Sequence, residues 1–192
     1  ELRGAGNILG AQQHGHMEAV GYDLYLKLLG DAGAEQKGEV SDTREEECLI
    51  DLPISAHIPD EYIREYSAKL DMYRRIADIR TMEDSLDVYD ELIDRFGEPP
   101  EAVQGLIEVA LLRNMAANLG IFEVHQMEDR VLLYPRKLDM KLGAKLTKKL
   151  ERRVLISAGA KPYYAIRCGK GLTPLDTLRE ALEVANEPDE EF

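Results

Sequence analysis

The stretch TMEDSLDVYDELIDRFGEPP, residues 81–100, decides the fold because it carries the signals for one helix and for both of its ends. Thr81 is a typical helix cap, and Asp84, three residues on, brings it close to a capping box. Gly97 ends the helix, and the prolines at 99 and 100 prevent its continuation. Apolar side chains recur at the helical period, and they predict this inner face: Leu86, Tyr89, Leu92, Ile93 and Phe96.

Helices are predicted on both sides of this stretch. Asp60 is expected to cap the earlier one, whose inner face is predicted to carry Ile63, Tyr66, Leu70, Tyr73, Ile76 and Ala77. The later helix runs from about residue 101 to residue 119 and stops at Gly120. Because it is apolar around most of its girth, we expect it at the centre of the core.

The remaining pattern alternates short strands with helices. Residues 48–54 read as a short strand, and residues 121–126 and 131–134 read as a hairpin around Glu128-Asp129. A basic amphipathic helix follows at 138–153, then strands at 154–157 and 163–168, and a last helix opens at Thr173-Pro174. The sequence therefore predicts an α+β fold: a helical segment and linker, followed by a compact domain of several helices with small antiparallel β-sheets.

The first 47 residues have a different character. Residues 1–15 form a glycine-rich loop without the Gly-Lys-Ser/Thr ending of a phosphate-binding loop, and no strand precedes it. An amphipathic helix is predicted at 16–29 and a solvated linker at 30–47. The chain opens inside the loop and without Met, so we expect it to be the end of a longer protein. Arg3 and Gln13 lie on either side of the glycine-rich turn, and both make directed hydrogen bonds.

Composition narrows the classes of function. The chain has 192 residues, of which 44% are hydrophobic and 32% charged, as expected of a folded globular protein. No apolar run suits a membrane span and no export leader is evident, and the two distant cysteines fit a reducing compartment, so we expect a cytoplasmic protein and a monomer. The net charge of −13 disfavours nucleic acid and favours an acidic surface that meets a basic protein partner.

Neither a metal site nor a catalytic site is predicted. His14 and His16, two residues apart on a helix, point in different directions and have no neighbouring ligand cluster. Cys48 lies in an apolar strand, where a thiol is usually a small core residue. No nucleophile elbow or supported carboxylate pair occurs, so we expect no catalytic residue, no bound metal and no enzyme activity in this chain by itself.

Two charged helix faces each leave two interpretations open. Basic residues of the 137–153 segment fall on one side of it: Lys137, Lys141, Lys145, Lys148 and Arg152. They could bind a nucleic-acid backbone, and the chain would then be a free-standing nucleic-acid-binding module. Alternatively, they form a solvated face on which the aliphatic parts of the lysine side chains cover the edge of the core. Glu91 and Asp94, three residues apart on one turn, suit either the arginines of a partner or plain surface charges.

Several segments, taken in order, resemble the C-terminal part of the bacterial transcription-repair coupling factors, the Mfd family. They are Leu2-Arg3-Gly4-Ala5-Gly6-Asn7-Ile8-Leu9-Gly10 with Gln13 and Gly15, Val20-Gly21-Tyr22-Asp23-Leu24-Tyr25, Ile58-Pro59-Asp60-Glu61-Tyr62-Ile63, Tyr73-Arg74-Arg75-Ile76-Ala77, and Glu91-Leu92-Ile93-Asp94-Arg95-Phe96-Gly97. They cover roughly the first two-thirds of the chain. The sequence departs from the family at Arg64-Glu65, where relatives often have Pro-Asp, and at His14, where they tend to have Ser.

The resemblance implies two parts. Residues 1–47 are similar to the end of the translocation motif shared with RecG-type helicases, where Arg3 and Gln13 would couple motor movement to a stroke along double-stranded DNA. Residues 48–192 resemble the C-terminal regulatory domain, which packs on a UvrB-like module of the same protein and masks its UvrA-recruiting surface until the motor engages stalled RNA polymerase. Glu91 and Asp94 would face basic side chains of that module. ATP and Mg²⁺ would bind the motor lobes of the parent translocase, and no cofactor is expected in this chain.

Overall fold

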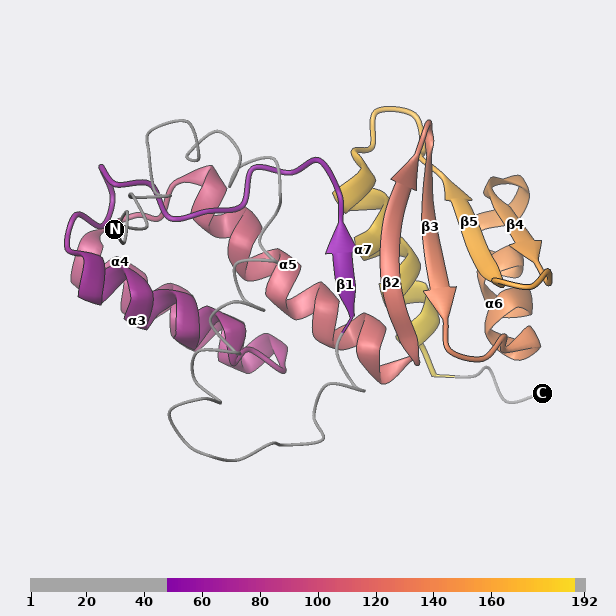
Figure 1. Cartoon of the computed structure of the whole chain (residues 1–192), viewed down its shortest axis with the longest axis horizontal. Coiled ribbons are helices and arrows are strands. Elements are labelled where there is room, and N and C mark those ends of the chain that lie inside the picture. Colours follow the sequence, from indigo (N-terminus) through magenta and orange to yellow (C-terminus); the bar gives the residue numbers. More distant parts are fainter. Residues whose placement is uncertain (1–47, 189–192) are drawn as a thin grey trace, which may run out of the picture.

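The computed structural model describes residues 48–188 (Figure 1). The predicted glycine-rich loop, the helix at 16–29, the linker at 30–47, and the residues Arg3, Gln13, His14 and His16 lie outside this range. In chain order the elements are β1 (Leu49–Asp51), α3 (Tyr66–Ala77), α4 (Met82–Phe96), α5 (Glu101–Asn118), β2 (Ile121–Met127), β3 (Arg130–Pro135), α6 (Met140–Leu150), the short 3₁₀ helix η2 (Glu151–Arg153), β4 (Val154–Ser157), β5 (Tyr163–Arg167) and α7 (Pro174–Asn186). The α+β class is confirmed.

The strands form one five-stranded sheet in the order β1-β2-β3-β5-β4. The predicted hairpin is β2 and β3, and Glu128 turns it with a φ of 53°. The sheet departs from the expected small antiparallel sheets in two respects. The hairpin joins β4 and β5 through β3–β5 pairing, and β1 pairs with β2 in parallel. Both differences come from pairing between distant segments, which local patterns do not encode.

Helices pack on the sheet and on one another. In Figure 1, α6 and α7 lie behind the sheet, while α3 and α4 lie at the opposite end of the molecule. Helix α5 contacts elements of both ends, namely α3, α4, α7, β1 and β2. Val103 and Leu106 of α5 are fully buried, which confirms the prediction that this helix is central to the core.

The ends of α4 are as the sequence predicts. The Thr81 hydroxyl accepts the Asp84 N–H at 3.1 Å, and the Asp84 carboxylate accepts the Thr81 N–H at 2.8 Å, so the capping box is complete. Gly97 follows the helix with a φ of 85°, a conformation that favours glycine. The cap of the last helix is confirmed too, since Thr173 and Asp176 form the same reciprocal pair and Pro174 is the first residue of the helix.

The predicted inner face of α4 is wrong in part. Leu92 is fully buried as expected, but the core-facing side is completed by Ser85 and Val88. Leu86 and Ile93 are exposed by 58% and 37%. The helix is therefore turned so that part of its apolar surface faces solvent.

The predicted start of the preceding helix is also wrong. Asp60 begins a turn, in which the N–H groups of Tyr62 and Ile63 both donate to the Pro59 carbonyl at 3.1 Å. Helix α3 begins only at Tyr66, after the extended Glu65. Ile63, at the end of this turn, is buried, whereas Tyr66, the first residue of the helix, is 72% exposed. The chain therefore enters the core before the helix begins.

Candidate functional site

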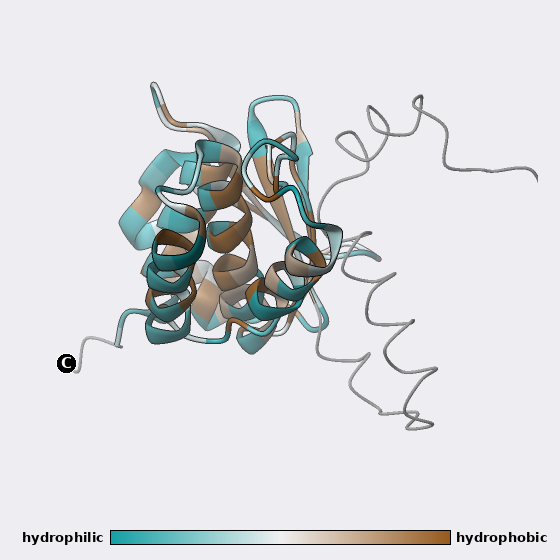
Figure 2. Ribbon diagram, turned by 90° about the vertical axis from the view of Figure 1, so that its left-hand side faces the viewer, coloured by the Kyte–Doolittle hydropathy of each residue, from teal (hydrophilic) through white to brown (hydrophobic). Residues whose placement is uncertain are grey.

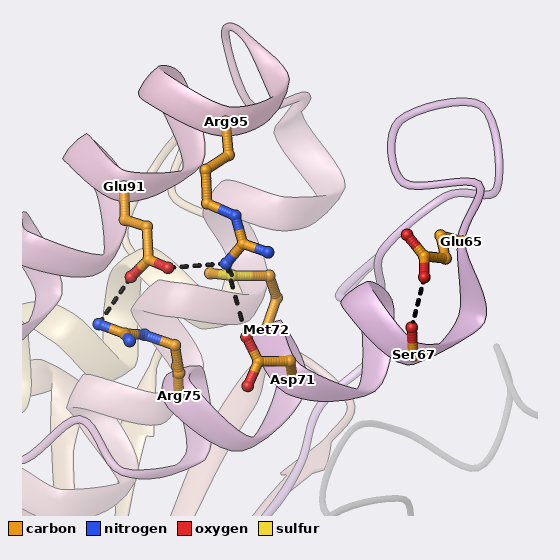
Figure 3. Close-up of polar contacts among 7 residues, drawn as sticks. All are labelled: Glu65, Ser67, Asp71, Met72, Arg75, Glu91 and Arg95. Carbon is orange, nitrogen blue, oxygen red and sulfur yellow. Dashed lines mark hydrogen bonds and ion pairs between the residues drawn. The ribbon is translucent and has the colours of Figure 1, made fainter.

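The acidic turn of α4 contains the two residues singled out by the sequence, and the structure gives them different surroundings. The Glu91 side chain is 21% exposed and points toward α3 (Figure 3). Asp94 is exposed, and within residues 48–188 its carboxylate makes no ion pair or hydrogen bond. Of these two residues, only Asp94 therefore offers a partner a carboxylate that has no bond within the described domain.

Glu91 is the centre of an ionic network between α3 and α4 (Figure 3). Its two carboxylate oxygens accept from Arg75 Nη2 at 2.6 Å and from Arg95 Nη1 at 2.8 Å. The same Arg95 nitrogen lies 3.5 Å from the Asp71 carboxylate, and the Arg95 guanidinium lies 4.9 Å from the centroid of the Phe96 ring. The hydrogen bond to Glu91 is the main cause that raises the pKa of Arg95 above its usual value. This network ties the two helices together.

Sequence reasoning missed the basic members of this network. Arg95 lies four residues after Glu91, so the helical i,i+4 rule was a signal for that pair. Arg75 comes from another helix, and no local pattern indicates its approach. Beside the network, an open cleft of about 290 Å³ lies between α3 and α4, lined by Arg75, Asp78, Ile79, Asp84, Asp87 and Val88.

The basic helix is partly committed to the fold. Lys145 Nζ donates to the carbonyls of Ala185 and Glu187 at the end of α7, and Lys149 Nζ lies 3.0 Å from the Glu187 carboxylate. Leu142, Leu146 and Leu150 are buried on its other side, as the amphipathic pattern predicts. The residues Lys137, Lys141, Lys148 and Arg152 are exposed. Lys145 thus serves the α6–α7 contact, and nucleic-acid binding by this helix stays a prediction.

Other candidate sites resolve into structural roles. Cys48 is 2% exposed and belongs to the core, as predicted. Among residues 48–188, no three His, Cys, Asp or Glu side chains are grouped so as to hold a metal ion. Within the same residues, we find no helix with the length and apolarity that a membrane crossing requires. The described residues form an α+β domain whose candidate site is a charged surface on two helices, α3 and α4.

Comparison with known proteins shows which family this domain resembles. The family described as the TRCF domain matches residues 52–142. The transcription-repair-coupling factor of Bacillus subtilis (strain 168) is 42% identical over 132 residues, which are 69% of this chain and 11% of that protein. That of Staphylococcus aureus (strain USA300) is 34% identical over 158 residues, 82% of this chain and 13% of that protein. A crystal structure of the C-terminal domain of transcription-repair coupling factor superposes with a TM-score of 0.62 and 22% identity, covering 76% of this chain and 98% of that one.

The chain therefore belongs to the family of transcription-repair coupling factors, and its described part has the fold of their C-terminal domain. The chain spans only 11% and 13% of the length of these two relatives. The name of these relatives refers to a coupling of transcription and repair.

Proposed function

We propose that this chain is the regulatory end of an ATP-dependent double-stranded DNA translocase of the bacterial cytoplasm. The parent protein displaces stalled RNA polymerase and recruits nucleotide excision repair through UvrA. The domain that starts at residue 48 rests on the UvrB-like module of the same protein and masks its UvrA-recruiting surface. Arg3 and Gln13 couple movement of the motor lobes, which bind ATP and Mg²⁺, to DNA translocation. The chain by itself catalyses no reaction.

The observation that carries the proposal is the acidic turn of α4 in a chain of this family. Asp94 is exposed and unpaired among the described residues, so it can meet a basic side chain without breaking an existing bond. Glu91 is already held by Arg75 and Arg95, and this fixes the position of the helix that presents Asp94. We assign the direct contact with the partner to Asp94. The Glu91 carboxylate keeps its bonds within the fold and also contributes to the contact with the partner.

The contact acts as a releasable mask rather than as a permanent interface. An exposed ion pair contributes about 0–1 kcal/mol, and only exclusion of water from the contact raises that contribution. Within one polypeptide the two surfaces meet at a high effective concentration, so a weak contact is sufficient to keep the mask closed. A conformational change of the motor then has only a small free energy to overcome when it opens the mask.

Calorimetric titration of the 192-residue chain with the isolated UvrB-like module tests the proposal. We expect the Glu91→Ala/Asp94→Ala pair to weaken binding by about tenfold or more, because both carboxylates of the turn are removed. Glu183→Ala, which removes an exposed acidic residue of α7, is the matched control and should bind as the wild type does.

Folding has to be checked in parallel, since Glu91 links α3 to α4. Melting curves of Glu91→Ala and Asp94→Ala as single variants separate the two effects, and we expect only the first to lower the melting temperature. Unchanged binding of a folded double variant would place the contact elsewhere on the domain. If the wild type does not bind in a mixture, the same series is repeated with the module joined to the chain by a flexible linker, with amide exchange at α4 as the readout.

A further inference from the structure

Helix α4 carries a row of apolar side chains on its solvent side. Met82, Leu86 and Ile93 are exposed by 62%, 58% and 37%, and Tyr89 is half-buried between the last two. Their spacing of four, three and four residues places them along one line of a helix, about 16 Å long. In Figure 2, where the α3–α4 end of the molecule faces the viewer, the helices of this end carry both brown and teal segments. Single exposed apolar residues are common on proteins, but an aligned row along one helix is typical of an interaction surface.

A row of carboxylates runs beside the apolar row. Each apolar residue is followed directly by an acidic one, in the pairs Met82-Glu83, Leu86-Asp87, Tyr89-Asp90 and Ile93-Asp94. All four acidic side chains are exposed, and in the described part of the chain none of them has an ion pair or hydrogen bond. Like charges three and four residues apart repel one another on a helix. A partner that brings positive charge would reduce the repulsion between these carboxylates.

The acidic row separates the apolar row from the ionic network. A helix turns by about 100° per residue, so Glu91 projects about 160° away from Ile93, whereas Asp94 projects between them. Figure 3 shows Glu91 directed toward Arg75 of α3. A partner that lies on the apolar and acidic rows therefore meets Asp94 but does not need to reach Glu91.

We propose that the α4 double row, defined as these four apolar and four acidic residues, docks a segment whose apolar side chains are flanked by lysine or arginine. The apolar row supplies the buried centre of the contact, and the acidic row supplies its orientation and its charge complementarity. This inference rests on the proposed function, because the segment is expected on the masked UvrB-like module. It shifts the centre of the contact from Asp94 to Leu86 and Ile93.

Two other occupants fit less well. A second copy of the chain that pairs through the same surface would bring two acidic rows together, because a two-fold interface joins a surface to itself. Nucleic acid is repelled by four adjacent carboxylates. A basic protein segment with an apolar ridge satisfies both rows at once.

The test measures binding of the UvrB-like module to the 192-residue chain by calorimetry. We expect Leu86→Gln/Ile93→Gln to weaken binding by about tenfold or more, because both side chains lose their apolar contact. Glutamine keeps the helix propensity, and both positions are exposed, so the fold is retained. Met140→Gln, at a 61% exposed apolar residue of α6, is the matched control and should bind as the wild type does. Asp87→Asn/Asp90→Asn should weaken binding and reduce its dependence on salt.

The outcomes distinguish this inference from the proposed function. If the Leu86→Gln/Ile93→Gln variant binds like the wild type while the Glu91→Ala/Asp94→Ala pair does not, the contact is purely ionic, and the double row is overturned although the mask stands. If the module is joined to the chain by a flexible linker and slows amide exchange nowhere in the described domain, the mask and the double row are both overturned. Slowed exchange over residues 82–94 that is lost in the Leu86→Gln/Ile93→Gln variant supports both.

Discussion

At the scale of single residues, Gly105 shows that a close backbone contact can outweigh helix propensity. A glycine inside a helix normally costs about 1 kcal/mol relative to alanine. Here a Cβ atom would lie 2.9 Å from the backbone carbonyl oxygen of Ser55, in the loop that leads from β1 toward α3. We expect Gly105→Ala to lower the free energy of unfolding by about 1–3 kcal/mol, as measured by urea denaturation. Gly159→Ala is the control, because a Cβ there would make only an ordinary contact with Ser157 Oγ at 3.9 Å. A gain in stability for Gly105→Ala would mean that the loop moves away at little cost.

Thr177 is a residue whose polar group is not used by the fold. Its side chain in α7 is fully buried, and its hydroxyl has no hydrogen-bond partner among the described residues. Valine has a similar shape and a similar helix propensity without the unpaired hydroxyl. Thr177→Val should therefore raise the free energy of unfolding by about 1 kcal/mol. Thr147→Val, which removes a 2.8 Å hydrogen bond to the Gly143 carbonyl, should give no such gain. A loss of stability at residue 177 would reveal a partner for its hydroxyl.

At the scale of the elements, two capping boxes make the stability sensitive to acid. Backbone N–H groups of Arg80 and Thr81 lower the pKa of Asp84, and the Thr173 hydroxyl and N–H lower that of Asp176. A carboxylate whose pKa is lower in the folded state stabilises fully above its unfolded pKa of about 4, and this contribution is lost as the pH falls through the folded pKa. Asp84→Asn/Asp176→Asn should thus be less stable than the wild type at pH 7, and the difference should shrink as the pH falls below about 4.

Urea midpoints at pH 7 and pH 3 measure this effect. Asp90→Asn removes an exposed carboxylate of α4 that has no bond in the described domain, so it controls for the change in net charge. A difference between the wild type and the double variant that stays constant with pH would show that the charge of the two caps contributes nothing.

The helices also show where sequence patterns are sufficient and where they fail. Thr81 and Gly97 were predicted correctly, because a cap and a left-handed glycine act within a few residues of the chain. Asp60 was assigned wrongly, because the turn at Pro59 buries Ile63 before any helix starts. Leu86 and Ile93 are apolar and correctly spaced, so the pattern put them in the core, but a periodic pattern cannot tell a core face from an interaction face. Leu86 and Ile93 are the misassigned part of that face.

The candidate site, like the helices, was predictable only where the signal lies within one helix. The acidic turn with Glu91 and Asp94 is visible in the sequence, because the two residues are neighbours on one helix. The commitment of Glu91 to Arg75 was not predictable, because it depends on how α3 packs against α4. The two carboxylates therefore differ in availability, although the sequence presents them as equivalent.

At the scale of the whole molecule, the arrangement of the sheet depends on distant pairing. Ile50 of β1 pairs with Val124 of β2, and Val131 of β3 pairs with Ile166 of β5. Strand order and direction are set by which apolar faces are buried together, and the alternation within each strand contains no information on its neighbour. The α+β class could be predicted from the order of helices and strands along the chain. The joining of all five strands in one mixed sheet could not.

Most of the buried apolar residues form one cluster that reaches from Cys48 to Leu182, and α5 contacts both the helical end and the sheet. A domain with one continuous core is expected to unfold in a single cooperative transition. Ile76→Ala in α3 and Leu182→Ala in α7 each remove a fully buried side chain at opposite ends, and each should cost about 2–5 kcal/mol. Both should shift the same transition, so that tyrosine fluorescence and far-ultraviolet circular dichroism coincide in each variant. If Ile76→Ala instead melted α3 and α4 in a separate step, the end of the molecule that carries the α4 double row would be an independent unit, and docking there would be coupled to its local folding.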